Sequence, residues 1–275
     1  MKPTLDSKPL TTETQAKKDA PACGSPLQTP AGPQPIAVPF ADHTLRGDGF
    51  RMPCETLVLH GAGQSSRSRF AHLRQALCRR GIPSASFDFI GHGDTGGRLP
   101  GSSLRARTEQ AAAVIQYACR EPLTLIAASM SGYTAIKLTE RFRVANLILL
   151  VPAVYTPRAY DLPFGPDFSA AIRQPGSWQD SDAFSILAAF RGNLLVVAAE
   201  GDDVIPRRVV ERLHASADSA GFRKLHIVPG SGHLSLFARE EDFREVLDMM
   251  AALYRCGPYD RADVRYRHGT KPAKR

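Results

Sequence analysis

Short apolar runs recur along the chain and alternate with stretches in which apolar residues stand three or four positions apart. A short run with no polar alternation is typical of a strand buried on both faces, and the wider spacing is typical of an amphipathic helix. The predicted strands span residues 55–60, 84–89, 123–128, 144–151, 193–199 and 224–228. Their alternation with helices predicts an α/β fold, with a mostly parallel central sheet covered by helices on both faces.

The predicted helices lie between these strands. Their apolar positions are Phe70, Leu73 and Leu77, then Ala111, Val114, Ile115 and Ala118, then Val209, Val210 and Leu213, and finally Phe243, Val246, Leu247, Met250 and Leu253. The pattern is weaker at residues 36–51. One or two short strands are expected there, with a turn at the glycine-containing stretch 46–49.

Three segments stand apart from this alternation. Residues 1–35 are rich in Pro, Thr, Lys and Ala with few large apolar side chains, which predicts a disordered N-terminal arm. Residues 152–192 are too long for a simple crossover and hold Trp178, the single tryptophan, so we expect a small cap insertion. The main domain is then expected at 36–255, followed by a basic C-terminal tail at 256–275.

Charge and cysteine content narrow the class of protein. The net charge is +8, and about half of it lies in the tail, which holds six basic and two acidic residues. The tail carries no nucleic-acid-binding motif, so nucleic acid is an unlikely partner and a solvated tail is the simpler interpretation. Five scattered cysteines without a Cys-x-x-Cys pair favour reduced thiols. With no apolar run of membrane-spanning length and no signal-peptide pattern, a cytoplasmic location is expected.

Reactive side chains follow three of the predicted strands. Ser129 comes after residues 123–128, Asp202 after 193–199, and His233 after 224–228. Because reactive groups gather at the carboxyl ends of parallel strands, we expect these three to meet. A serine needs a base to take its proton, histidine has a suitable pKa, and a carboxylate fixes the histidine tautomer. The neighbouring Asp203 remains an alternative acid, and Glu200 is also close in sequence.

A serine nucleophile also needs donors for the charge that develops on the substrate oxygen. The backbone N–H of Met130, directly after Ser129, is one candidate, and that of Ala62 in the loop 60–63 is the other. His60 is expected to shape this loop by hydrogen bonds, and His92 and Asp88 to hold the glycine-rich loop that follows residue 89. No metal-ligand spacing and no dinucleotide-binding motif is present.

With these motifs in order, the chain resembles the α/β-hydrolase superfamily of serine hydrolases. The stretches that carry the resemblance are His-Gly-Ala-Gly at 60–63, Phe-Asp-Phe-Ile-Gly-His-Gly-Asp-Thr-Gly-Gly at 87–97, Gly-Asp-Asp-Val-Ile-Pro at 201–206 and Gly-Ser-Gly-His at 230–233. The resemblance implies the α/β-hydrolase fold, a Ser129–Asp202–His233 triad, and an oxyanion hole formed by Ala62 and Met130.

The serine stretch departs from the family pattern. Ala127 and Ser131 stand where glycine is usual on either side of the nucleophile; both are small, so the turn is expected to form, with some added crowding that would lower activity. The stretch 125–129 is locally similar to the elbow of luminescence-type acyl-ACP thioesterases, a likeness of only a few residues. Trp178 is expected either to line an acyl pocket or to pack.

The function expected from the sequence is hydrolysis of a small-molecule carboxylic ester or acyl thioester through an acyl-enzyme, with no cofactor. The altered serine stretch leaves a second hypothesis open, namely a weakly active or inactive scaffold that binds an acyl-like ligand. Acyl transfer to an acceptor other than water, and peptide cleavage, are further alternatives.

Overall fold

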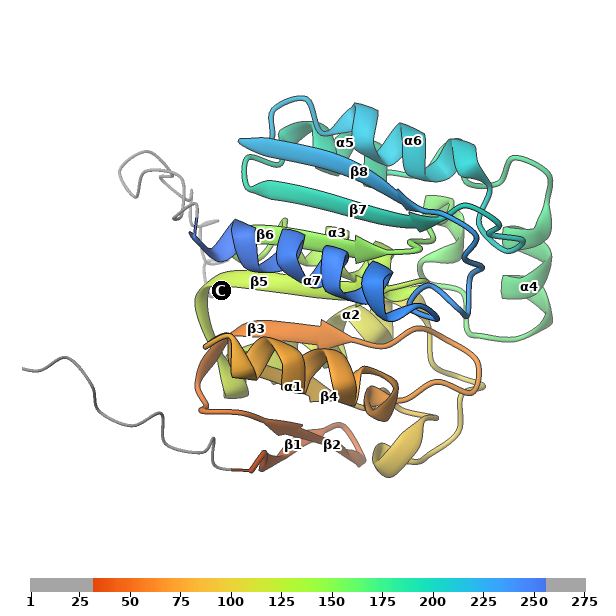
Figure 1. Cartoon of the computed structure of the whole chain (residues 1–275). Helices are drawn as coiled ribbons and strands as arrows, with labels where there is room; N and C mark the ends of the chain where they lie inside the picture. Colours follow the sequence, from red (N-terminus) through yellow and green to blue (C-terminus); the bar gives the residue numbers. More distant parts are fainter. Residues whose placement is uncertain (1–31, 256–275) are drawn as a thin grey trace, which may run out of the picture.

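The computed structural model describes residues 32–255, which build one eight-stranded sheet in the order β1-β2-β4-β3-β5-β6-β7-β8 (Figure 1). The strands are β1 (Gln34–Phe40), β2 (His43–Gly49), β3 (Cys54–Leu59), β4 (Ser84–Phe87), β5 (Cys119–Ala128), β6 (Val144–Leu150), β7 (Asn193–Ala199) and β8 (Phe222–Val228). β1 and β2 pair antiparallel, β2 runs antiparallel to β4, and the remaining neighbours are parallel. The predicted α/β fold is confirmed.

The helices cover both faces of the sheet. They are α1 (Ala71–Arg79), α2 (Leu104–Ala118), α3 (Ser131–Leu138), α4 (Pro166–Arg173), α5 (Ala183–Ala189), α6 (Arg207–Ser216) and α7 (Glu240–Arg255), with short 3-10 helices η1 (Arg67–Phe70), η2 (Gly93–Thr95) and η3 (Pro157–Ala159). α1 and α7 lie on one face and share one hydrophobic core, while α2, α3, α5 and α6 contribute to the core on the other face (Figure 1).

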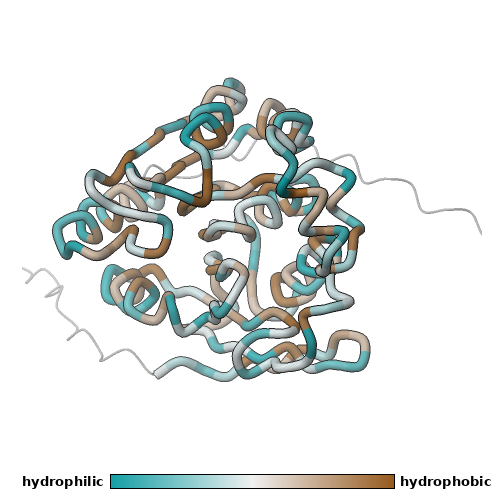
Figure 2. The backbone as a smooth tube through the Cα atoms, turned by 90° about the vertical axis from the view of Figure 1, so that its right-hand side faces the viewer, coloured by the Kyte–Doolittle hydropathy of each residue, from teal (hydrophilic) through white to brown (hydrophobic). Residues whose placement is uncertain are grey.

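Alternate residues of each central strand enter different cores. In β5, Leu125 and Ala127 join the core beneath α2 and α3, whereas Ile126 and Ala128 join the core beneath α1 and α7. The same alternation holds in β3, β6 and β7. Because both faces are covered, most positions of these strands are apolar, which explains the continuous runs in the sequence. Figure 2, which looks onto the carboxyl ends of the parallel strands, shows these brown strand segments between helices that carry teal residues.

The predicted turn at residues 46–49 is wrong. The hairpin turns at Ala41 and Asp42, where Phe40 pairs with His43 and Ala41 has a positive φ of 50°. Gly47 instead lies inside β2. A side chain has no room at this position, because a Cβ atom there would stand 2.3 Å from the carbonyl oxygen of Ser86 in β4. The glycine allows close approach of two strands, a second use of the residue that a turn pattern does not distinguish.

Several predicted boundaries are only partly open to comparison. Residues 1–31 of the predicted arm and all of the predicted tail (256–275) lie outside the described residues, while Gln34 and Pro35, assigned to the arm, belong to β1. Residues 152–192 connect β6 to β7 and carry η3, α4 and α5. Their role as a cap stays a prediction. In Figure 1, α4 lies beyond the carboxyl ends of the strands.

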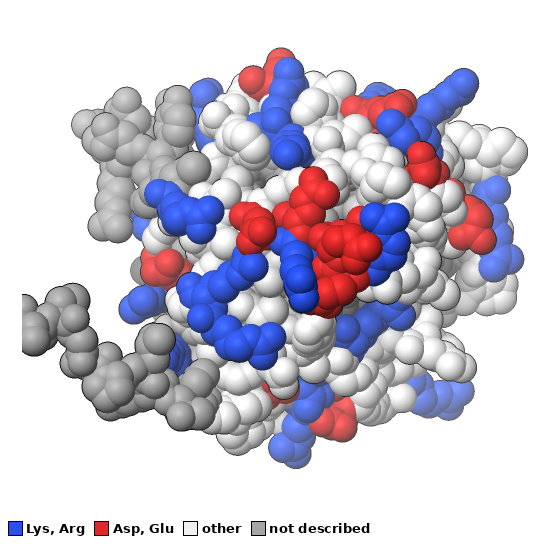
Figure 3. Space-filling view, in the orientation of Figure 1, with Lys and Arg blue, Asp and Glu red and all other residues white. Residues whose placement is uncertain are grey.

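The surface carries both signs of charge. On the face formed by α1 and α7, Lys and Arg side chains lie beside Asp and Glu side chains rather than forming a field of one sign (Figure 3). Several of them are paired, including Arg80 with Asp248 at 2.6 Å and Arg244 with Glu240 at 2.9 Å. Among residues 32–255, no helix is long and apolar enough to cross a membrane.

Candidate active site

Ser129 sits in a sharp turn between β5 and α3 and has a positive φ of 50°. A non-glycine residue in this conformation is strained and persists only where its surroundings fix it. Here the Ser129 N–H donates to the Leu150 carbonyl at 2.9 Å, and the Ser129 carbonyl accepts from the N–H groups of Gly132 (2.9 Å) and Ala153 (3.0 Å). The neighbouring strand β6 and the segment after it therefore hold the turn.

The backbones around this turn approach each other closely. A Cβ atom on Gly61 would stand 3.2 Å from the Cβ of Ser129, and one on Gly132 would stand 2.7 Å from the Cβ of Pro152. Ala127 and Ser131 are both fully buried. Their extra atoms are accommodated, because Ala127 faces the core and the Ser131 hydroxyl donates to the His60 carbonyl at 2.5 Å.

Ser129, His233 and Asp202 form a continuous chain of hydrogen bonds. His233 Nε2 lies 3.0 Å from Ser129 Oγ, and His233 Nδ1 lies 3.1 and 3.0 Å from the two carboxylate oxygens of Asp202. A carboxylate accepts hydrogen bonds, so Nδ1 carries the proton and Nε2 is left with a lone pair facing the serine hydroxyl. This is the tautomer that a general base needs.

The acid loop holds the Asp202 carboxylate rigidly. Asp202 Oδ1 accepts from the backbone N–H groups of Val204 (2.9 Å) and Ile205 (2.8 Å). Asp203, the alternative acid, is exposed, and the carboxylate beside His233 belongs to Asp202. Glu200 has a different part, since its Oε2 accepts from the Gly230 N–H at 2.8 Å and so ties the acid loop to the histidine loop.

The two predicted oxyanion donors are available. Within residues 32–255, neither the N–H of Ala62 nor that of Met130 has an intramolecular hydrogen-bond partner. Ala62 lies in the loop after β3, whose Gly61 contacts Ser129, and Met130 directly follows Ser129. Two unpaired donors beside a nucleophile can bind an oxyanion.

His60 is a buried, neutral histidine behind this loop. Its Nε2 accepts from the Phe89 N–H at 3.2 Å, so its Nδ1 carries the proton and donates to the Gly61 carbonyl at 2.8 Å. Burial, together with the positive charge of Arg107, lowers the pKa of His60 to about 2. The ring is therefore uncharged near neutral pH, and it links the oxyanion loop to Phe89 in the segment after β4.

A network centred on Arg67 holds the glycine-rich loop that follows β4. The Arg67 guanidinium donates to Asp88, to Asp48 at 2.7 Å and to Asp94 at 2.6 Å. The Asp88 carboxylate also accepts from the Asp94 N–H at 2.9 Å, and a Cβ on Gly93 would overlap it. The structural role expected for Asp88 agrees with these contacts, whereas Arg67 was not singled out from the sequence.

Residues 152–192 are tied to the helix that begins beside Ser129. The Tyr133 hydroxyl donates to Asp182 Oδ1 at 2.5 Å, and Lys137 Nζ donates to Asp182 Oδ2 at 3.1 Å. Burial raises the pKa of Tyr133, so its hydroxyl remains a donor. Trp178 packs edge-on against Phe184, which agrees with the packing alternative for this residue.

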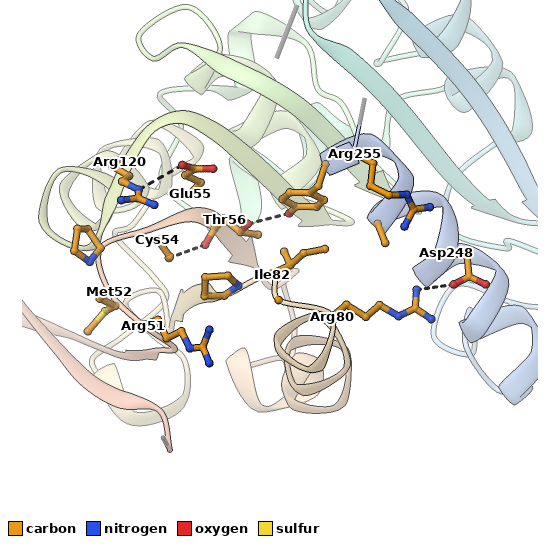
Figure 4. A pocket seen from close by; sticks show the side chains of 15 residues that line it. Arg51, Met52, Cys54, Glu55, Thr56, Arg80, Ile82, Arg120, Asp248 and Arg255 are labelled. Carbon is orange, nitrogen blue, oxygen red and sulfur yellow. Dashed lines mark hydrogen bonds and ion pairs between the residues drawn. The ribbon is translucent and has the colours of Figure 1, made fainter. Parts of the chain in front are cut away.

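Two pockets differ in their relation to the triad. One of about 530 Å³ is lined by His233 but by neither Ser129 nor Asp202, and its walls combine apolar side chains such as Phe243 with the charged Arg69 and Glu240. The larger one, about 880 Å³, lies at the opposite end of the sheet, between the start of β3 and the ends of α1 and α7 (Figure 4). Four arginines line it: Arg51, Arg80, Arg120 and Arg255. None of Ser129, Asp202 and His233 lines this larger pocket.

The described residues hold no group of three or more His, Cys, Asp or Glu side chains that could bind a metal ion. His60 and His92 lie with ring centroids 4.9 Å apart, but His60 is committed to its two backbone partners.

Comparisons with known proteins agree with this geometry. The sequence model of the family described as "Serine aminopeptidase, S33" matches residues 55–175, from β3 into α4. The match covers less than half of the chain; together with the α/β-hydrolase fold that the chain shares with solved structures, it supports the resemblance to the α/β-hydrolase superfamily. No curated protein sequence matches the chain significantly.

Solved structures share the fold at low sequence identity. The chain is similar to Est1E from Butyrivibrio proteoclasticus with ferulic acid bound (17% identity, TM-score 0.63, covering 80% of this chain and 99% of that one). It is similar to the esterase EaEST from Exiguobacterium antarcticum (19% identity, TM-score 0.60, covering 80% of this chain and 100% of that one). It also resembles the thioesterase domain of the curacin biosynthetic pathway (14% identity, TM-score 0.59, covering 81% of this chain and 99% of that one).

Proposed function

We propose that the protein is a serine hydrolase that cleaves a carboxylic ester or an acyl thioester. The observation that carries the proposal is the unbroken hydrogen-bonded chain from Ser129 Oγ through His233 to Asp202. A site that had lost its chemistry would be expected to lack one member of this chain or to present the wrong tautomer. The unpaired N–H groups of Ala62 and Met130 complete the set of groups that acyl transfer requires.

The proposed reaction proceeds in two halves. Ser129 Oγ attacks the substrate carbonyl carbon while His233 Nε2 takes the hydroxyl proton, and the resulting oxyanion is bound by Ala62 and Met130 N–H. His233 then gives that proton to the departing alcohol or thiol, which leaves Ser129 acylated. Water, deprotonated by the same nitrogen, attacks the acyl carbon; His233 then returns that proton to Ser129 Oγ as the ester bond breaks, which releases the carboxylic acid and restores the serine.

The surroundings of the site favour an apolar acyl or leaving group. The pocket beside His233 has largely apolar walls, and two of the few exposed large apolar side chains, Val204 and Leu234, stand next to the proposed acid and base. Leu234, directly after His233, is 76% exposed. Leu234 also lines this pocket, so an apolar group bound there would contact it. The protein of similar fold with ferulic acid bound and the thioesterase domain fit such a substrate.

A fluorophosphonate probe followed by mass spectrometry tests the proposal. An adduct on Ser129 in the wild type, lost in S129A and much slower in H233A, supports an activated serine. If the folded wild type gives no adduct and hydrolyses no ester or thioester of graded chain length, the proposal is wrong, and ligand binding by an inactive scaffold becomes the better account. Product analysis with added alcohols or amines separates hydrolysis from acyl transfer.

The proposed location is the cytoplasm. The described cysteines, Cys54, Cys78 and Cys119, are all free thiols, as expected in a reducing compartment. We propose a small-molecule acyl substrate as the partner and assign no role to nucleic acid, since acidic and basic side chains are interspersed on the face drawn in Figure 3.

A further inference from the structure

Arg107 in α2 is a charged side chain in the interior of the protein. Only 1% of its surface is exposed, and within residues 32–255 it forms no ion pair with a carboxylate. Arginine is almost never fully buried without a partner, because removing its charge from water is costly. Burial accordingly lowers the pKa of Arg107. The hydrogen bonds that Arg107 donates all go to groups beside the proposed active site.

One nitrogen of the guanidinium lies between the oxyanion loop and the nucleophile turn. Arg107 Nη2 is 3.0 Å from the His60 carbonyl, 3.2 Å from the Gly61 carbonyl and 3.0 Å from the Ser131 hydroxyl. Ser131 is the first residue of α3, two positions after Ser129. A single charged donor therefore connects the loop after β3 with the start of the helix after β5.

The contact with Gly61 has a direct geometric consequence. The peptide bond between Gly61 and Ala62 is trans, so its carbonyl and its N–H point in opposite directions. This carbonyl accepts from two donors on the buried side, Arg107 Nη2 and His60 Nδ1 at 2.8 Å. Holding the carbonyl toward the interior turns the Ala62 N–H toward the opposite side. Hydrogen bonds to a carbonyl also polarise its peptide and strengthen the N–H as a donor.

The Ser131 hydroxyl explains the unusual residue at this position. It donates to the His60 carbonyl at 2.5 Å and accepts from Arg107, so it fills the space between the two. Glycine, the usual residue in the family pattern, has no group that could do this. The face of the Phe89 ring lies 3.7 Å from the guanidinium carbon and supplies further stabilisation of the charge. Nε and Nη1 have no hydrogen-bond partner in the described part of the chain.

We propose that Arg107 is a positioning residue for the oxyanion hole, which it orients by holding the Gly61–Ala62 peptide and by bridging to the nucleophile turn through Ser131. The inference rests on the proposed acyl-transfer function and names a part of the machinery that neither the motifs nor the fold comparisons assign. Arg107 does not touch the reacting atoms; it acts through the Ala62 N–H.

The test compares R107M with R107K and with R105M, a matched control. Arg105 lies in the same helix but is exposed and pairs with Asp161 outside this cluster. The assays are steady-state hydrolysis of a p-nitrophenyl ester and the affinity for an alkyl trifluoromethyl ketone, which forms an oxyanion on the serine. Loss of an entire oxyanion donor lowers kcat by ~10²–10³-fold, so misorientation of one should cost ~10–100-fold.

We expect both kcat and the affinity for the ketone to fall by ~10–100-fold in R107M, with KM within about threefold of the wild-type value. R107K should recover part of the loss, since an ammonium can still donate to a carbonyl. R105M should match the wild type. Unchanged kcat and ketone affinity in folded R107M, or an effect on KM alone, would overturn the proposal.

If R107M does not fold, S131G carries the test. It removes the bridge while leaving the arginine in place, and we expect a smaller loss in kcat and ketone affinity at constant KM. A kcat equal to or above that of the wild type overturns the proposal. Failure of the underlying function is distinguishable, because the wild type would then show neither turnover nor fluorophosphonate labelling, whereas failure of the positioning role alone leaves the wild type active.

Discussion

Replacing Asp202 by Asn gives a sharp test of the proposed triad, because the acid loop determines how the new amide must sit. Asp202 Oδ1 accepts from the N–H groups of Val204 and Ile205. In D202N the amide oxygen has to take that place, since an NH₂ group cannot accept from two N–H donors. The amide nitrogen then occupies the Oδ2 position, 3.0 Å from His233 Nδ1.

The amide nitrogen can only donate, and the amide oxygen, 3.1 Å from His233 Nδ1, already accepts from two N–H groups, so the pairing is best satisfied when His233 presents an unprotonated Nδ1 to the amide nitrogen. The imidazole proton then moves to Nε2, which would donate to Ser129 Oγ instead of accepting from it. The base is lost although every heavy atom stays in place. An Asp-to-Asn change that inverts the tautomer in this way lowers kcat by ~10⁴-fold in a well-studied serine protease, or about 5.5 kcal/mol in the barrier.

The assay is the rate of ester hydrolysis together with the rate of fluorophosphonate labelling, measured for D202N and for D203N. Asp203 is the adjacent, exposed carboxylate and serves as the matched control. We expect the hydrolysis and labelling rates of D202N to fall ~10³–10⁴-fold below those of the wild type, with a thermal midpoint close to that of the wild type. The rates of D203N should remain within a few-fold of the wild-type rates. A D202N enzyme within tenfold of the wild type, or an equally large loss in D203N, would refute the reasoning.

Three further predictions concern the surroundings of the site. In G61A the new Cβ would stand 3.2 Å from that of Ser129 and push the oxyanion loop away; kcat should fall by up to ~100-fold at little cost in thermal midpoint, and an unchanged kcat would contradict this. Y133F removes the bond to Asp182 and should lower the free energy of unfolding in urea by about 1–2 kcal/mol, whereas an unchanged value would mean that the bond contributes nothing. The third concerns His60, whose pKa in the folded protein is about 2, below its ordinary value near 6.5. Below about pH 6.5 the unfolded chain therefore binds a proton that the folded protein does not. As the pH is lowered further, the free energy of unfolding should decrease by up to about 1.4 kcal/mol per pH unit. In H60Q, unfolding measured at pH 5 and pH 7 should show a smaller difference than in the wild type; an equal difference would show that another group is responsible.

The sequence was most informative where packing leaves no choice. The strand at 193–199 was predicted with the bounds that the structure gives, because the six residues after Asn193 are all apolar, as is typical of a strand buried on both faces. Ser129, Asp202 and His233 could be placed together because the carboxyl ends of parallel strands share one edge of a sheet. The hairpin turn was missed because Ala41 adopts a positive φ without being glycine, while Gly47, a turn residue by composition, serves a close approach of strands.

Arg107 shows a different limit of sequence reasoning. It falls on the buried side of α2, in line with Leu104, Ala111 and Ile115, so a charge on an apolar stripe was the available signal. The role of Arg107 could not be predicted from this signal, because the oxygens it binds belong to residues 60, 61 and 131, which only the fold brings together. Likewise, the serine at 131 suggested only crowding until its hydrogen-bond partners were visible.

The link between the acid loop and the histidine loop has a consequence for how the chain could be divided. Glu200 accepts from Gly230, and the Gly201 N–H donates to the Ser231 carbonyl at 2.8 Å, so acid and base form one unit on β7 and β8. The nucleophile and its oxyanion loop belong to β3 and β5, and only the β6–β7 ladder joins the two parts of the sheet. A cut within residues 152–192 would give two fragments that each hold half of the proposed chemistry. Turnover would then report their reassembly, which makes the fold a natural scaffold for a split-enzyme sensor.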